Sequence, residues 1–76
     1  MKNSLKIERA IHHLTQQELA TTIGVSRQTI NSIESGKYVP STVLSLKISR
    51  VFGKSIHEIF ELEEDDRPPS SPFPHV

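Results

Sequence analysis

The sequence predicts an all-α domain of five short helices, with a short strand permitted near the C-terminal end. Three observations support this prediction. Apolar residues recur at the three- and four-residue spacing of helices along most of residues 4–60. Serine or threonine stands at the N-cap position of four helical stretches. Glycine follows three of the stretches, where a helix needs a residue that adopts a left-handed conformation.

Length and composition limit the class of protein. Seventy-six residues make one small domain with a marginal core, and such chains often gain stability by pairing. The absence of cysteine excludes a disulfide framework and a thiolate metal site. No apolar run approaches the roughly 20 residues of a membrane span, and the N-terminus lacks the apolar core of a signal peptide. We therefore expect a soluble, cytoplasmic protein without a membrane partner.

The formal net charge of zero hides an uneven distribution. Residues 1–57 hold eight Lys and Arg against three Glu, whereas residues 58–76 hold six acidic residues against Arg67. A basic helical body is typical of proteins that bind nucleic acid. The acidic end is expected to lie away from the phosphates.

Residues 15–24 predict a helix with clear limits. Thr15 and Glu18 have the spacing of a capping box, and Leu14 and Leu19 that of a hydrophobic staple across it. Gly24 is expected to end this helix in a left-handed conformation.

A second helix is predicted directly after it, from the N-cap Ser26 to the stop at Gly36. Its apolar side holds Ile30 and Ile33. The opposite side holds amides, hydroxyls and a guanidinium, but no acid and no lysine: Arg27, Gln28, Asn31, Ser32 and Ser35. Amide and guanidinium groups read base edges in the major groove of DNA. A polar surface helix is the alternative, although such a face more often holds Glu and Lys.

The remaining helices are predicted to support this pair. Residues 4–13 form a first helix whose inward residues are Leu5, Ile7 and Ile11. His12 and His13 stand at the C-terminal end of this helix, where partly charged groups interact favourably with the helix dipole. They are not expected to bind a metal. Residues 42–52 form a core helix that follows Pro40 and the cap Ser41, with a wide apolar face: Val43, Leu44, Leu46, Ile48, Val51 and Phe52.

The C-terminal part is predicted to be a short helix and a tail. Ser55 and Glu58 have capping-box spacing for a helix over residues 56–60, whose buried side is Ile56, Ile59 and Phe60 and whose His57 is exposed. Residues 60–63 alternate as a short strand does. We expect a domain over residues 1–62 and a disordered acidic and proline-rich tail over residues 63–76; a docking peptide around Pro69 and Pro72 is the alternative for the tail.

The residues from Leu14 to Lys37 resemble the helix-turn-helix of the Cro and phage-repressor (XRE) family. The small, glycine and branched apolar positions of that motif are filled by Ala20, Gly24 and Ile30, and further apolar positions by Leu19, Ile23, Val25 and Ile33. The resemblance extends over roughly residues 3–62, and is greatest to short stand-alone bacterial and archaeal members. It implies a five-helix, lambda-repressor-like DNA-binding domain. At the position of Glu8, many family members have an apolar residue. Ile7 is therefore expected to pack against the core in its place.

The resemblance and the helix projection imply roles for individual residues. The helix over residues 26–35 is expected to enter the major groove, and Gln16 or Gln17 to hold a phosphate, with Gln16 favoured. Lys37 is expected to meet a phosphate, and Tyr38 either a phosphate or the protein itself. The complete expected DNA-binding set is Gln16, Gln17, Ser26, Arg27, Gln28, Thr29, Asn31, Ser32, Lys37 and Tyr38.

Two further sites are predicted outside the DNA-binding set. The family commonly pairs an arginine of the first helix with a glutamate at the end of the recognition helix, here Arg9 and Glu34. A homodimer on a palindromic operator is expected because one helix reads only a few base pairs. We expect the dimer interface to involve Ile56, Phe60 and Leu62.

The leading functional prediction is a sequence-specific double-stranded DNA-binding transcriptional regulator, acting as a repressor. The alternative keeps the fold but makes the domain a protein-interaction module, such as an antitoxin-like partner. No nucleophile–base pair, metal cluster or phosphate-binding glycine loop indicates an enzyme, and no cofactor or small-molecule ligand is expected.

Overall fold

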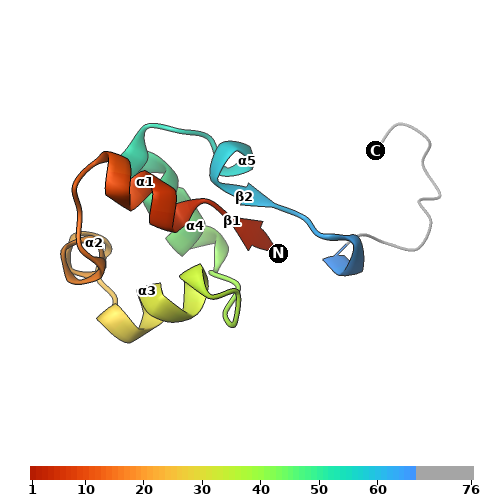
Figure 1. Ribbon diagram of the computed structural model, residues 1–76, viewed down its shortest axis with the longest axis horizontal. Coiled ribbons are helices and arrows are strands. Elements are labelled where there is room, and N and C mark those ends of the chain that lie inside the picture. Colours follow the sequence, from red (N-terminus) through yellow and green to blue (C-terminus); the bar gives the residue numbers. More distant parts are fainter. Residues whose placement is uncertain (67–76) are drawn as a thin grey trace.

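The computed structural model describes residues 1–66, and the proline-rich stretch on which the tail prediction partly depends lies outside them. The predicted five helices and the short strand are confirmed (Figure 1). The helices are α1 (Leu5–Ile11), α2 (Gln16–Ile23), α3 (Arg27–Glu34), α4 (Thr42–Phe52) and α5 (Ile56–Ile59); the strands are β1 (Lys2–Asn3) and β2 (Phe60–Glu61), and a 3-10 turn η1 (Glu64–Asp66) follows. None of the helices in residues 1–66 is long and apolar enough to cross a membrane.

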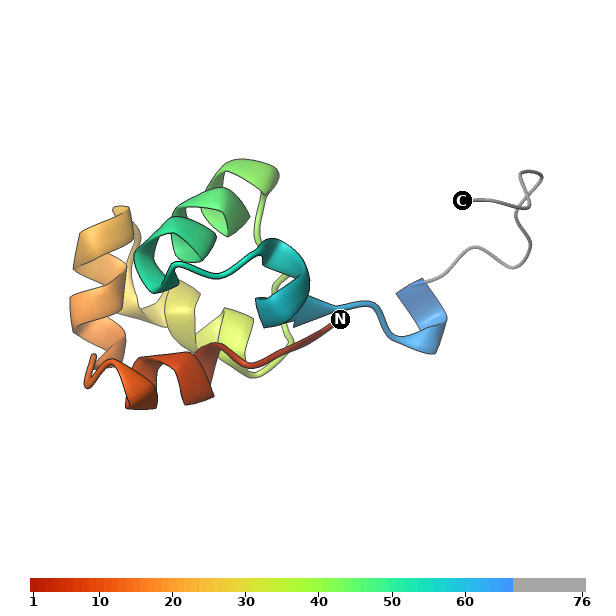
Figure 2. The ribbon, with the colours of Figure 1, turned by 90° about the horizontal axis from the view of Figure 1, so that it is seen from above.

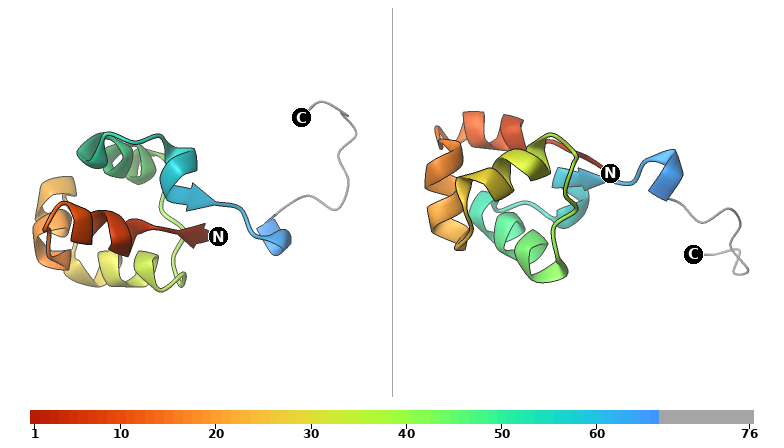
Figure 3. Two further views of the ribbon diagram at one scale, coloured as in Figure 1. Left: turned by 45° about the horizontal axis from the view of Figure 1, so that its top comes forward. Right: turned by 90° about the horizontal axis from the view of Figure 1, so that it is seen from below.

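All five helices contribute to one core. Seen from above, α1 and α4 lie on opposite sides of the body, with α2 at one end (Figure 2). The buried apolar residues are Leu5, Leu19, Ala20, Ile23, Ile30, Ile33, Leu44, Ile48, Phe52, Ile59 and Phe60. Seen from below, α3 lies across the front of the molecule, between α1 and α4 (Figure 3). One long side of α3 therefore faces solvent while its other side closes the core.

The two ends of the domain meet in a short antiparallel pair of strands. Lys2 pairs with Glu61 and Asn3 with Phe60, and the Ser4 N–H donates to the Ile59 carbonyl at 2.9 Å. Asn3 also donates from Nδ2 to the Ile33 carbonyl at 2.9 Å. This residue, which nothing in the sequence pattern singled out, thus ties the N-terminus to the end of α3.

The predicted helix limits around the central pair are confirmed. Thr15 and Glu18 form both hydrogen bonds of a capping box, and Gly24 ends α2 with a φ of +79°. The side chain of Ser26 caps α3. The capping box predicted for α5 is wrong, because the Ser55 hydroxyl donates to the Glu58 carboxylate at 3.2 Å and caps no backbone N–H.

The capping box leads to a pH-dependent prediction. The pKa of Glu18 lies below its ordinary value because the Thr15 backbone N–H, and then the Thr15 hydroxyl, bonds its carboxylate. The stabilisation is fully present above the unfolded-state pKa, about 4.3, and is lost as the pH falls through the lower pKa of the folded protein. An NMR titration of the Glu18 carboxyl carbon should give a lower midpoint in the folded protein than in urea. Equal midpoints would contradict the prediction.

The predicted inward face of α1 is wrong in part. Leu5 is buried as expected, but Ile7 and Ile11 are 62% and 58% exposed. Glu8 points inward instead and is only 3% exposed. Its Oε2 accepts a hydrogen bond from the Lys54 ammonium at 2.7 Å, while its Oε1 is buried without a hydrogen-bond partner. The burial of Glu8 therefore depends on an ion pair with the loop after α4.

The apolar face of α4 is narrower than predicted. Leu44, Ile48 and Phe52 are buried, and Val51 packs partly against them. Val43 and Leu46 are exposed, because they lie on the side of α4 that no other element within residues 1–66 covers.

Candidate nucleic-acid interface

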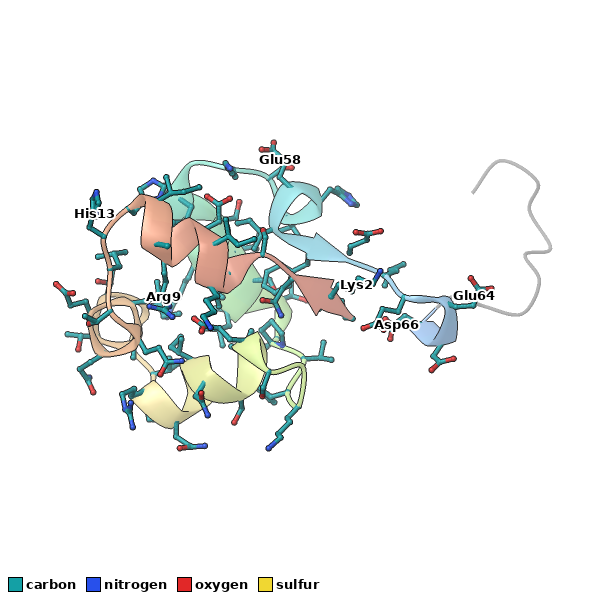
Figure 4. The ribbon with its side chains drawn as sticks, in the orientation of Figure 1. Lys2, Arg9, His13, Glu58, Glu64 and Asp66 are labelled. Carbon is teal, nitrogen blue, oxygen red and sulfur yellow. The ribbon has the colours of Figure 1, made fainter. Side chains whose placement is uncertain are left out.

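The solvent-facing side of α3 carries the groups expected to read bases. Arg27, Gln28 and Asn31 are exposed, and Thr29 and Ser32 are half-buried. Side chains along this side of α3 point away from the body of the molecule (Figure 4). Ile30 and Ile33 hold the opposite side of α3 in the core. The side of α3 that is free to enter a groove is thus the side that carries amides and a guanidinium.

A buried ion pair fixes α3 against α1. Arg9 Nε lies 2.5 Å from Glu34 Oε2, and Arg9 Nη2 lies 3.0 Å from Glu34 Oε1. Arg9 Nη1 also donates to the Leu14 carbonyl at 2.9 Å. Figure 4 shows Arg9 between α1 and the α2–α3 pair. The residues expected to pair therefore do so in a two-bond arrangement that sets geometry as well as charge.

Gln16, at the first position of α2, extends this network toward the outer side of α3. Its Nε2 donates to Glu34 Oε1 at 3.1 Å and lies 3.4 Å from Asn31 Oδ1. Both N–H bonds of this amide therefore have partners within the protein. Gln17 is exposed and donates to the Thr21 hydroxyl at 3.2 Å. The backbone N–H groups of Gln16 and Gln17 stand in the first turn of α2, where no helical carbonyl is available to them.

A groove of about 520 Å³ runs along the other edge of α3. Its lining comes from the α2–α3 turn, from α3, from the loop after it and from α4: Ile23, Gly24, Val25, Gln28, Thr29, Ser32, Tyr38, Ser41, Val43, Leu44 and Lys47. Lys37 and Tyr38 are exposed on the loop. Lys47 Nζ, 3.4 Å from the Ile23 carbonyl, places a positive charge in this groove.

The acidic end of the described chain lies apart from α3. The turn η1 extends from the body at the end opposite α2 (Figure 1), and Glu64 and Asp66 are carried there (Figure 4). The Met1 ammonium lies 3.0 Å from both Glu63 and Asp66. The pKa of Asp66 is lowered by the Glu63 backbone N–H and by this ammonium. These contacts hold negative charge away from the outer side of α3.

Comparison with known proteins identifies the family. A model of the helix-turn-helix family, of XRE type, matches residues 5–59. The chain belongs to this family. It is 56% identical over 66 residues to an HTH-type transcriptional regulator of Methanocaldococcus jannaschii, a match that covers 87% of this chain and 100% of that protein. It is 46% identical over 66 residues to the regulator YgzD of Bacillus subtilis, again over 87% of this chain and 100% of the relative.

Solved structures support the same assignment. The solution structure of the SOS-response transcriptional repressor LexA from Eubacterium rectale superposes with a TM-score of 0.70 and 26% identity, covering 92% of this chain and 73% of that one. The chain is therefore a helix-turn-helix, DNA-binding transcriptional regulator with a lambda-repressor-like fold.

The structure leaves most of the residues predicted to bind DNA exposed to solvent. Gln17, Ser26, Arg27, Gln28, Asn31, Lys37 and Tyr38 are exposed, and Gln16, Thr29 and Ser32 are half-buried. The Ser26 hydroxyl is engaged with the Thr29 N–H at 3.2 Å. Sequence reasoning missed Lys47, which was counted only in the total charge, and missed the contact between Gln16 and Glu34, which joins different helices.

Proposed function

We propose that this regulator is a repressor that binds a two-fold symmetric double-stranded DNA operator as a homodimer, with α3 in the major groove. The observation that carries the proposal is the outer side of α3, where Arg27, Gln28 and Asn31 are exposed. Guanidinium and amide groups pair with guanine and adenine edges in this groove. A helix side that only contacted solvent would not need amide and guanidinium groups together.

The other residues of the expected set, apart from Ser26, each have a role in this proposal. Ser32 meets a base edge, and the Thr29 methyl group contacts a thymine methyl. Lys37 and the Tyr38 hydroxyl meet phosphates on one flank of α3. On the other flank a phosphate is held by the first turn of α2, through the backbone N–H groups of Gln16 and Gln17. Such contacts position the protein on the duplex, whereas α3 selects the sequence.

The first experiment is selection of bound sequences from a random duplex pool, followed by affinity measurements against salt. An enriched two-fold motif is the expected result, with affinity that falls as the salt concentration rises. No enriched motif, or binding that depends on salt alone, would contradict the proposal and favour the protein-interaction module.

Paired substitutions separate base reading from phosphate contact. Gln28→Ala should weaken binding to the selected operator by about 1–3 kcal/mol per half-site and relax preference at one base pair. Lys37→Ala should weaken binding to all sequences alike and flatten the salt dependence. Both are measured by fluorescence anisotropy with operator and scrambled duplexes. A change of sequence preference in Lys37→Ala alone would reverse the two assignments.

The proposed dimer surface rests mainly on Leu62. Phe60 is only 5% exposed and belongs to the core, and Ile56 packs partly against the same core. Leu62 is exposed beside a hollow of about 420 Å³ that Met1 and Ile56 also line. Leu62→Glu is expected to shift sedimentation from dimer to monomer, whereas Leu46→Glu, also an exposed leucine, should leave the dimer intact. Dissociation by Leu46→Glu alone would place the interface on α4.

A further inference from the structure

Gln16 connects the buried ion pair to the DNA-facing side of α3. Its Nε2 lies 3.1 Å from Glu34 Oε1 and 3.4 Å from Asn31 Oδ1. We propose that Gln16, itself oriented by Glu34, turns the Asn31 amide so that its NH₂ group faces the DNA, and that Asn31 consequently reads guanine rather than adenine. This inference rests on the proposed DNA-reading function and names the base that one residue of the site recognises.

Glu34 determines the orientation of Gln16. The Glu34 side chain is only 7% exposed, and Arg9 holds both of its oxygens with separate N–H groups. A carboxylate paired with a guanidinium only accepts hydrogen bonds. The atom of Gln16 that faces Glu34 must therefore be the nitrogen, since its oxygen would meet a second acceptor there. The direction of the Gln16 amide is thus fixed by chemistry that lies inside the fold.

Gln16 in turn determines the orientation of Asn31. The second N–H of the Gln16 amide is left for the Asn31 side, where Oδ1 lies at 3.4 Å. This distance is long for a hydrogen bond, so the contact adds little energy by itself. Turning the Asn31 amide over would place two NH₂ groups against each other and lose this contact, so the orientation seen is favoured. The arrangement seen leaves Asn31 Nδ2 directed away from Gln16.

The polarity of Asn31 decides which base it can recognise. Adenine presents one acceptor, N7, and one donor, the N6 amino group, so an asparagine needs both its oxygen and its nitrogen to pair with it. Guanine presents two acceptors, O6 and N7. Asn31 is exposed on the DNA-facing side of α3 with its oxygen directed at Gln16. It therefore offers donors alone, which match guanine.

The test uses duplex selection with four proteins. Asn31→Ala first identifies the base pair that Asn31 reads, as the position where preference is lost. At that position the unchanged protein is expected to favour guanine over adenine by roughly tenfold. Gln16→Met, which keeps the length of the side chain without its amide, frees Asn31 to turn, so the ratio should fall to about threefold or less. Thr21→Val, at an exposed residue of α2 outside the expected DNA-binding set, should leave the ratio unchanged.

A merely structural role for Gln16 would give a different result. Loss of affinity for all sequences alike in Gln16→Met, with the guanine-to-adenine ratio intact, would overturn the inference. So would a preference for adenine at the position that Asn31→Ala identifies. Either result leaves the proposed repressor function standing, because an operator would still be selected.

A measurement on the DNA-free protein tests the orientation itself. If Asn31 is oriented as proposed, its Nδ2 protons should show only a weak NOE to the Nε2 protons of Gln16. A strong NOE between the two NH₂ groups would overturn the inference whatever the DNA experiments give. If the unchanged protein selected no motif, the proposed DNA-binding function would be contradicted, and the proposed role of Asn31 in reading a base with it.

Discussion

Replacing Arg9 with methionine is expected to lower the free energy of unfolding by about 3–5 kcal/mol, the usual cost of removing one partner of a buried ion pair. The Glu34 carboxylate would stay in a site where it is only 7% exposed, without the guanidinium that bonds both of its oxygens. The Leu14 carbonyl would lose its donor as well. Since small domains have a total stability of about 5–15 kcal/mol, this variant should lie close to the limit of folding.

Urea unfolding followed by circular dichroism measures the effect. Lys6→Met removes a positive charge from an exposed site on the same helix, and should change the free energy of unfolding by less than about 0.5 kcal/mol. The double variant Arg9→Met with Glu34→Met removes the stranded carboxylate and should recover much of the loss. If Arg9→Met were no more costly than Lys6→Met, the ion pair would have no part in holding α3 against α1.

The parts of the fold that were predicted correctly depend on contacts between near neighbours in the sequence. The capping box joins residues three apart, and the left-handed end of α2 depends on Gly24 alone. The outer side of α3 follows from helical periodicity once its limits are known. The helix-turn-helix could be recognised because its whole pattern lies within about 22 consecutive residues, 15–36.

The orientation of α1 could not be predicted in the same way. Leu5 and Ile7 are two residues apart, which places them roughly 200° apart around a helix. A helix packed on one side can bury only one of them. Leu5 is buried because the β1–β2 pair and the contact between Arg9 and Glu34 set the rotation of α1, and those contacts join residues 25 or more positions apart.

The same limit applies to the DNA-binding site. The resemblance favoured Gln16 over Gln17 as the residue that holds a phosphate. The structure adds that the side-chain N–H groups of Gln16 are directed at Glu34 and Asn31. Only the packing of α2 on α3 brings these three side chains together. Residue type and spacing therefore allow a DNA-binding set to be predicted, but they do not reveal which side-chain atoms of that set already have partners within the protein.

Replacing Glu8 with methionine is expected to have the opposite effect to the Arg9 variant, raising the free energy of unfolding by about 1–3 kcal/mol. The Glu8 carboxylate is as well buried as that of Glu34, but its Oε1 has no hydrogen-bond partner. Lys54, which bonds the other oxygen, is partly exposed. Its ammonium can therefore return to water, whereas methionine fills the site with apolar surface.

The sign of this change distinguishes two views of the Glu8–Lys54 pair. If desolvation of the carboxylate outweighs its single ion pair, Glu8→Met should raise the thermal midpoint, by about 4–8 °C for each kcal/mol gained. Lys54→Met should lower the midpoint, because it strands the buried charge. Loss of stability in both variants would show instead that the pair stabilises the fold in spite of the unpartnered oxygen. Both oxygens of Glu34 accept hydrogen bonds, whereas only one oxygen of Glu8 does. Comparing the two residues therefore tests whether complete hydrogen bonding of a buried carboxylate decides if it stabilises or destabilises the fold.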